Sequence, residues 1–152
     1  MSELKRVLLA EDSAHDVELT LAALGENHLA NEVVVARDGA EAWDYLRAKG
    51  QFEGRPPGNP AVVLLDLKMP RMDGLEVLRL MRSTPDFRSI PVVMLTSSRE
   101  ERDVIQSYEL GVNAYVVKPV AFEEFMTAVR NLGLFWAVLN QPPPGQQERK
   151  AA

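Results

Sequence analysis

One short stretch restricts the fold of this chain more than any other, the apolar run from Val62 to Leu65 that ends in Asp66. A run of this kind without alternation indicates a strand covered on both faces, as in a parallel sheet. An acid at the carboxyl end of such a strand faces the crevice in which open α/β sheets bind ligands. A lone aspartate can also serve only to cap the turn that Pro70 indicates. Whether Asp66 has a functional role therefore depends on the rest of the chain.

Composition is that of a globular protein. The 152 residues suit one domain, and contents of 46% hydrophobic and 26% charged residues are ordinary for it. The absence of cysteine excludes disulfides and thiolate metal ligands. The sequence has no signal-peptide pattern or membrane-length apolar run, and its net charge of −5 argues against a nucleic-acid surface. We therefore expect a cytoplasmic protein that binds neither nucleic acid nor membrane.

Strand-like and helix-like segments alternate along the chain. The expected strands are residues 6–10, 32–36, 62–66, 91–95 and 114–117. A helix is expected after each strand, several with capping-box spacing, with starts near Ser13, Asp38, Asp73, Ser98 and Ala121. This alternation predicts a doubly wound, five-stranded parallel sheet of order 2-1-3-4-5, the flavodoxin-like (βα)5 class. Residues 1–140 would form this domain and the Pro- and Gln-rich residues 141–152 a disordered tail.

The predicted strand order brings acids together. Its switch point lies between the first and third strands, which carry Asp12 and Asp66 at their carboxyl ends, and Glu11 precedes Asp12. Like charges about 4 Å apart repel by roughly 4 kcal/mol at an effective dielectric near 20, so such a cluster needs a cation or a proton. Oxygen ligands without histidine or cysteine favour a hard ion such as Mg²⁺.

Two further strand ends carry complementary groups. Thr96 supplies a hydroxyl and Lys118 an ammonium at equivalent positions. A carboxylate nucleophile, a metal, a hydroxyl and an amine around one point are what phosphoryl transfer to Asp66 requires. Each residue alone is more often a cap or a solvated side chain, but their coincidence at successive strand ends favours phosphoryl transfer.

The motifs at these strand ends resemble the receiver domain of two-component response regulators, the CheY-like family. The matching segments are 8–12, 64–74, 93–97 and 115–119, within a likeness that extends from about residue 6 to residue 139. The resemblance implies that Asp66 accepts a phosphoryl group from the phosphohistidine of a histidine kinase. The chain would then be a single-domain signalling switch in a phosphorelay.

Further roles follow from the resemblance. The Mg²⁺ ligands that it implies are Glu11, Asp12, Asp66 and the main-chain carbonyl of Lys68. Glu11 stands where Asp is commoner and would act through a bound water. Thr96 and Lys118 would contact the phosphoryl group, and Tyr115 would turn inward with Thr96 as an aromatic switch. The Lys118–Pro119 bond would be cis.

A narrower resemblance is to small regulators that partner bacterial phytochrome kinases. It is carried by the Gly- and Pro-rich segment 50–60, the helix start at 15–19 and the ending at 135–144. The segment 50–60 is also a long loop, of a length that is often functional or mobile. The expected partner is therefore a sensor histidine kinase, a bacteriophytochrome in the narrower interpretation.

The last expected helix, residues 121–139, is apolar on more than one face. Its late apolar residues are Leu132, Leu134, Phe135, Trp136, Val138 and Leu139. One apolar face suffices to cover a sheet, so the surplus indicates either a partner surface or a helix end wrapped over its own core. We expect a homodimer through the helix that ends at residue 111, the strand 114–117 and this last helix.

Two alternatives to a signalling switch remain. A Mg²⁺-dependent phosphohydrolase with an aspartyl phosphate would need a second acid two residues after Asp66, where this chain has Lys68. A phosphate-independent dimeric scaffold would not need the intact residues Asp12, Asp66, Thr96 and Lys118. We therefore predict no enzyme for a separate substrate, only self-phosphotransfer and slow autodephosphorylation.

Overall fold

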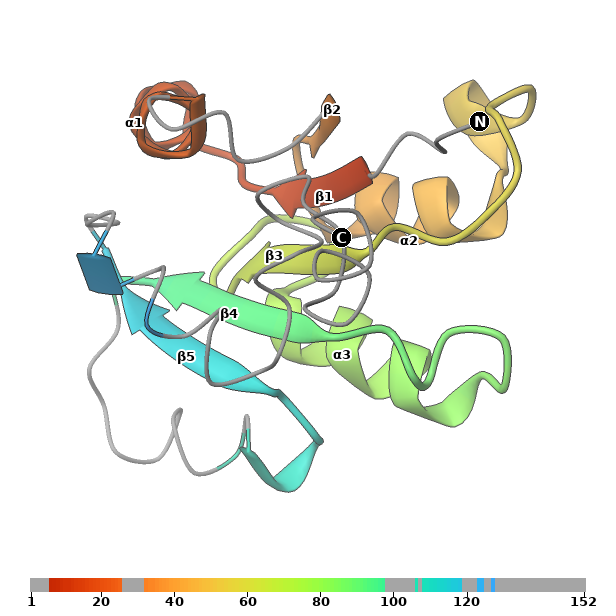
Figure 1. Cartoon of the computed structure of the whole chain (residues 1–152). Helices are drawn as coiled ribbons and strands as arrows, with labels where there is room; N and C mark the ends of the chain where they lie inside the picture. Colours follow the sequence, from red (N-terminus) through yellow and green to blue (C-terminus); the bar gives the residue numbers. More distant parts are fainter. Residues whose placement is uncertain are drawn as a thin grey trace, which may run out of the picture.

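The computed structural model describes residues 6–25, 32–97, 106, 108–118, 123, 124 and 127. The described residues form one five-stranded sheet of order β2-β1-β3-β4-β5, in which all neighbouring strands are parallel (Figure 1). The strands are β1 (Arg6–Ala10), β2 (Glu32–Ala36), β3 (Val62–Asp66), β4 (Val92–Thr96) and β5 (Ala114–Val117). The predicted doubly wound sheet and its strand order are confirmed.

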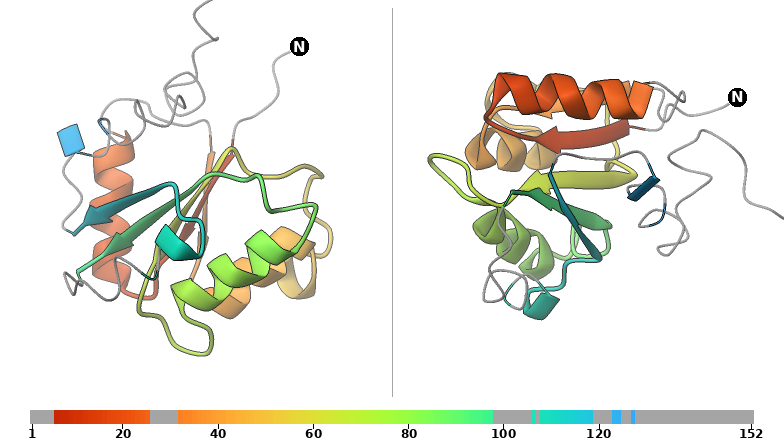
Figure 2. Two further views of the ribbon diagram at one scale, coloured as in Figure 1. Left: turned by 90° about the horizontal axis from the view of Figure 1, so that it is seen from below. Right: turned by 90° about the vertical axis from the view of Figure 1, so that its left-hand side faces the viewer.

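Helices cover both faces of the sheet. Helix α1 (Ala14–Gly25) lies on one face, and α2 (Gly39–Arg47) and α3 (Gly74–Ser83) lie on the other (Figure 2). Every residue of β3 is buried, because its alternate side chains enter different layers. Leu64 packs in the cluster that contains Leu24 of α1, whereas Leu65 packs in the cluster of α2 and α3. The unbroken apolar run is thus the central strand of two cores.

The helix starts follow the capping signals of the sequence. Ser13 Oγ accepts a hydrogen bond from the Asp16 N–H at 3.2 Å. Asp38 and Asp73 cap α2 and α3 in the same way, each accepting from the N–H three residues on, at 2.8 and 2.9 Å. These side chains satisfy N–H groups that have no partner inside the helix. They also fix where each helix leaves the carboxyl edge of the sheet.

The Gly- and Pro-rich segment between α2 and β3 is fastened to the domain by two arginines. It begins with a short 3-10 helix, η1 (Gly50–Phe52). Arg55 Nε donates to the Tyr45 carbonyl at 2.6 Å, and its guanidinium lies 4.4 Å from the centre of the Tyr45 ring. Arg6 Nη2 donates to the Pro57 carbonyl at 2.7 Å. The length of the segment alone gave no indication of these anchors.

The predicted elements of the second half are only partly within the described residues. Strand β4 begins at Val92 rather than Pro91, since Pro91 has no N–H to donate to the ladder. At its other end the strand includes Thr96. Of the helix expected to end at residue 111, the structure describes helical residues 106, 108 and 109. The helix expected at 121–139 is described only at 123, 124 and 127, and the domain boundary near 140 and the tail 141–152 lie outside the described residues. No described helix is long and apolar enough to cross a membrane.

Candidate functional site

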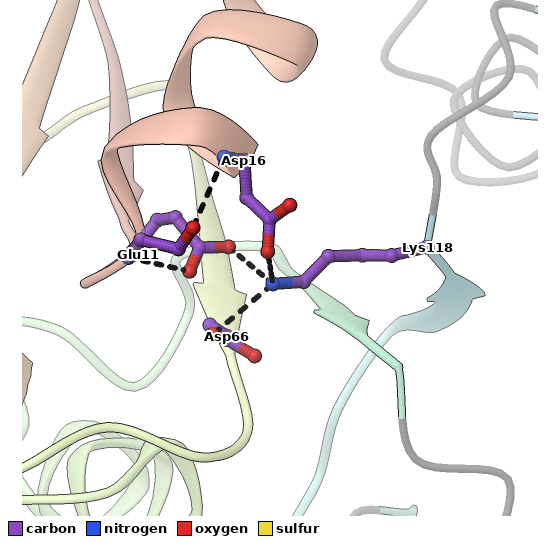
Figure 3. Close-up of polar contacts among 5 residues, drawn as sticks. Glu11, Asp16, Asp66 and Lys118 are labelled. Carbon is purple, nitrogen blue, oxygen red and sulfur yellow. Dashed lines mark hydrogen bonds and ion pairs between the residues drawn. The ribbon is translucent and has the colours of Figure 1, made fainter.

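The candidate site lies at the carboxyl edge of the sheet, where β1, β3 and β5 end (Figure 3). Asp66 is the last residue of β3, Glu11 directly follows β1, and Lys118 directly follows β5. Parallel strands place their carboxyl ends at one edge, and β1 and β3 are direct neighbours there. Strand β4 separates β5 from β3, so the long Lys118 side chain crosses that gap to reach the acids.

Three of the predicted site residues form a carboxylate cluster. Glu11, Asp12 and Asp66 each offer an oxygen, and these oxygens lie within 4.8 Å of one another. Glu11 and Asp66 are buried, with exposed fractions of 2% and 5%, whereas Asp12 is exposed. Buried carboxylates at this spacing repel one another unless a positive charge lies between them.

Lys118 supplies that positive charge in the described structure. Its Nζ donates to Glu11 Oε1 at 2.5 Å, to Asp16 Oδ2 at 2.9 Å and to Asp66 Oδ2 at 3.2 Å (Figure 3). The lysine side chain is only 11% exposed. An ammonium has three N–H donors, so these carboxylates use its full capacity.

The electrostatics of the cluster favour additional positive charge beside the Lys118 ammonium. The pKa of Glu11 is raised to about 7, mainly by burial and further by its hydrogen bond with Asp66 and the charge of Asp66, while the hydrogen bond from Lys118 acts in the opposite direction. Burial lowers the pKa of the Lys118 ammonium, but hydrogen bonds to Glu11 and Asp16 and the charge of Asp66 outweigh burial and hold it above its ordinary value. One ammonium therefore does not neutralise the acids around it.

The residues present fit a hard divalent cation. The three clustered groups, Glu11, Asp12 and Asp66, are carboxylates, and oxygen ligands of this type suit Mg²⁺ or Mn²⁺ better than soft metals. The exposed Asp12 leaves one side of the cluster open to solvent, which is where a cation would retain water. Lys68, whose main-chain carbonyl is the remaining expected ligand, lies in the connection between β3 and α3.

Three other predicted residues are placed less completely. Thr96 is the last residue of β4, and its register partner on β5 is Val117. The structure describes the backbone of Thr96 but not its side chain. Tyr115 lies within β5, where it is half-buried and packs against the core under α2 and α3. The Lys118–Pro119 bond involves Pro119, which is outside the described residues.

Asp16 is a site residue that the sequence reasoning did not identify. We expected it only as part of a helix start, and its N–H does bond to Ser13 Oγ. Its carboxylate, however, lies 2.9 Å from Lys118 Nζ, a contact between residues 102 positions apart in the chain. The available signal was its place in the first turn of a helix that starts beside the acids Glu11 and Asp12.

The connection that follows Asp66 is held by close contacts. Arg71 has φ 65°, in the left-handed region, and its Nε and Nη2 lie 2.9 and 2.7 Å from Asp38 Oδ2. Gly74 donates its N–H to the Leu67 carbonyl at 2.9 Å. These contacts fix the turn that carries Lys68 between the end of β3 and the start of α3.

Residues 7–130 match the protein family described as the response regulator receiver domain. Among curated proteins, the chain is 40% identical over 132 residues to the response regulator Rcp1 of Synechocystis sp.. That alignment covers 87% of this chain and 88% of Rcp1.

Similar solved structures include the bacteriophytochrome response regulator RtBRR, with 61% identity, a TM-score of 0.83 and coverage of 98% of this chain and 91% of that one. The Mn(2+)-bound form of Rcp1 has 38% identity and a TM-score of 0.74, covering 92% of this chain and 99% of that one. The phosphorylated cyanobacterial phytochrome response regulator RcpA has 38% identity and a TM-score of 0.74, covering 88% and 94% of the respective chains.

Proposed function

This chain belongs to the response regulator receiver family, and from that premise we propose that Asp66 accepts a phosphoryl group from a histidine kinase. Receivers are signalling switches in two-component pathways, and the likeness to phytochrome response regulators is close. The observation that carries the proposal is the placement of Asp66, a buried carboxylate at the sheet's switch point with Lys118 Nζ 3.2 Å from its Oδ2.

The chain's own residues account for the proposed transfer. An Asp66 carboxylate oxygen attacks the phosphorus of a phosphohistidine, so that a P–O bond forms, the P–N bond breaks and the imidazole leaves with the electron pair. Lys118, already beside Asp66, would donate to the phosphoryl oxygens as negative charge develops on them. We assign the Thr96 hydroxyl a similar contact and Tyr115 the role of an aromatic switch.

We assign the cation of this site as Mg²⁺. Its proposed ligands are Glu11, Asp12, Asp66 and the main-chain carbonyl of Lys68. When bound, the ion supplies positive charge that stabilises the phosphoryl oxygens in the transition state. Glu11 would act through a retained water, which would compete with Lys118 for Glu11 Oε1, since Oε2 already accepts from the Ser13 N–H.

The test of the proposed function is transfer from a phosphorylated sensor kinase. The kinase is labelled with ATP and Mg²⁺ and then mixed with the chain. The label should leave the kinase and appear on the chain in an adduct that survives acid and is lost in base, as an acyl phosphate is. Label that stays on every kinase tried, and is also not accepted from acetyl phosphate, would contradict the proposal.

Mg²⁺ should raise the thermal stability of the chain, because it binds the folded cluster and not the unfolded chain. At a free concentration about 100 times its Kd, a single ligand stabilises by about 2.7 kcal/mol. Asp12→Ala should abolish this response while the fold survives, since Asp12 is exposed and contributes no core packing. Differential scanning calorimetry with and without MgCl2 measures both. An unchanged response in Asp12→Ala would remove Asp12 from the site.

We propose further that the chain acts on no separate substrate. A phosphohydrolase with an aspartyl phosphate needs a general acid near its nucleophile, and the residue two positions after Asp66 is the cation Lys68. The remaining chemistry is acceptance of the phosphoryl group and its slow loss to water. The kinase that donates it is, in our proposal, a bacteriophytochrome, on the strength of the likeness to RtBRR.

We propose a two-fold homodimer whose interface consists of β5, the helix expected from Ser98 to residue 111 and the helix expected at residues 121–139. Its support is the surplus of apolar residues at 132–139 in the sequence and the helical residue Tyr108, which is 52% exposed. Light scattering at tens of micromolar should show a dimer for the parent and a monomer for Phe135→Asp. Leu19→Asp, which alters an exposed leucine of α1, should stay dimeric. A parent that is monomeric with and without a phosphate mimic would refute the dimer.

A further inference from the structure

The three carboxylates around the Lys118 ammonium are of two kinds. Glu11 Oε1 and Asp66 Oδ2, at 2.5 and 3.2 Å from Nζ, belong to the cluster that a cation would occupy. Asp16 Oδ2, at 2.9 Å, belongs to a carboxylate outside that cluster, on the first turn of α1 (Figure 3). The Lys118 ammonium thus binds two carboxylates that would be metal ligands, Glu11 and Asp66, and one that would not, Asp16.

A divalent cation in the cluster would compete with Lys118 for the oxygens of Glu11 and Asp66. Two positive charges at neighbouring positions repel, and a coordinated oxygen is a poorer acceptor for an ammonium. Lys118 is only 11% exposed, so water does not readily replace the bonds that it would lose. The ammonium therefore needs an anionic acceptor that is not a metal ligand.

Asp16 meets the requirements for an anionic acceptor of the Lys118 ammonium that is not a metal ligand. Its N–H donates to Ser13 Oγ at 3.2 Å, which fixes the turn from which its carboxylate extends. The amino end of α1 favours a negative charge in the first turn. Its side chain is 32% exposed, more than those of Glu11 and Asp66, so it lies at the solvent side of the ammonium, away from the buried acids.

We propose that Asp16 is a positioning residue for Lys118, which holds the ammonium when a divalent cation takes Glu11 and Asp66 and thereby strengthens cation binding. This inference rests on the proposed function, because it assigns the cation to the cluster of Glu11, Asp12 and Asp66. Asp16 acts through Lys118 and does not need to touch the cation.

The test is a titration of the full chain with MgCl2 at constant ionic strength, in which the rise in melting temperature gives an apparent Kd. Asp16→Asn should raise this Kd by about tenfold, the lower range for loss of a group that positions metal-site residues. Lys118→Met alone should lower the Kd, because it removes the competing ammonium. In the Lys118→Met background, Asp16→Asn should change the Kd by less than about twofold, since nothing remains for Asp16 to hold.

Two further variants separate this role from a general effect of charge. Glu18→Gln removes the same charge from an exposed position of α1, and its Kd should stay within about twofold of the parent's. Asp16→Glu keeps a carboxylate and should bind Mg²⁺ more tightly than Asp16→Asn. A Kd for Asp16→Asn equal to the parent's, or a rise that persists in the Lys118→Met background, overturns the role of Asp16 and leaves the metal site standing. A parent without any response to MgCl2 overturns the metal site and this inference with it.

Discussion

Asp66→Asn should reduce phosphoryl acceptance from acetyl phosphate and Mg²⁺ from a readily detected fraction of the chain to none. An amide oxygen is not a nucleophile at phosphorus under these conditions, whereas the rest of the site is unchanged. The substitution should leave the fold intact, because an asparagine oxygen can still accept the hydrogen bond from Lys118 Nζ. Intact mass spectrometry in mild acid, before and after exposure to base, measures the adduct.

A matched control for Asp66→Asn is Asp73→Asn. Asp73 is exposed and caps α3 through its Oδ1, and asparagine caps a helix as well as aspartate does. This variant should accept the phosphoryl group as the parent does. If Asp66→Asn were labelled to the same extent as Asp73→Asn, the acceptor would be another residue and the assignment of Asp66 would be wrong.

Gly74→Ala should be among the most damaging single-methyl changes in this chain. A Cβ at Gly74 would lie 2.3 Å from the Asp66 carbonyl oxygen and 3.1 Å from Leu67 Cα. Both are main-chain atoms, so no side chain can rotate away, and α3 must separate from the end of β3. We expect a loss of about 1–3 kcal/mol in the free energy of unfolding, the usual cost of overpacking, or more. Because Asp66 is displaced, the Mg²⁺ response should fall as well.

The sign of this prediction opposes helix propensity. Alanine in a helix is favoured over glycine by about 1 kcal/mol, so propensity alone predicts stabilisation at Gly74. Gly54→Ala is the matched control, since a Cβ at Gly54 meets nothing within 4 Å. Urea unfolding should place the midpoint of Gly54→Ala close to the parent's and that of Gly74→Ala well below it. A Gly74→Ala chain as stable as the parent would show that the approach of α3 to β3 is looser than described.

The turn after Asp66 shows how local signals and packing combine at the site. Asp73 was recognisable as a helix cap from its spacing to Glu76, and the cap is present. The ion pair between Arg71 and Asp38 was not recognisable, because the two residues lie 33 positions apart. The left-handed backbone of Arg71 had no sequence signal either, since arginine is not a residue that favours that region. Spacing rules describe bonds within one helix start, whereas an ion pair between two loops depends on how their helices pack.

The sequence by itself determined the strand order of the sheet and the proximity of the acidic residues at its carboxyl edge. Short apolar runs alternating with helix starts leave few topologies, and the order 2-1-3-4-5 places Glu11, Asp12 and Asp66 together by strand connectivity alone. The backbone supplies this information, since the end of a parallel strand has a fixed place. The residue types at the strand ends indicated a hard cation and phosphoryl transfer to Asp66, whereas the individual ligand and switch roles came from the resemblance to receivers.

Only the tertiary structure decided which further side chains reach that place. Asp16 was visible as a residue of a helix start, but its contact with Lys118 depends on the rotation of α1 about its axis and on its height above the sheet. The fastening of segment 50–60 by Arg6 and Arg55, and the contact of Gly74 with the Asp66 main chain, are of the same kind. Each joins two different parts of the fold, and their relative placement is set by how two cores pack against one sheet, which no local pattern encodes.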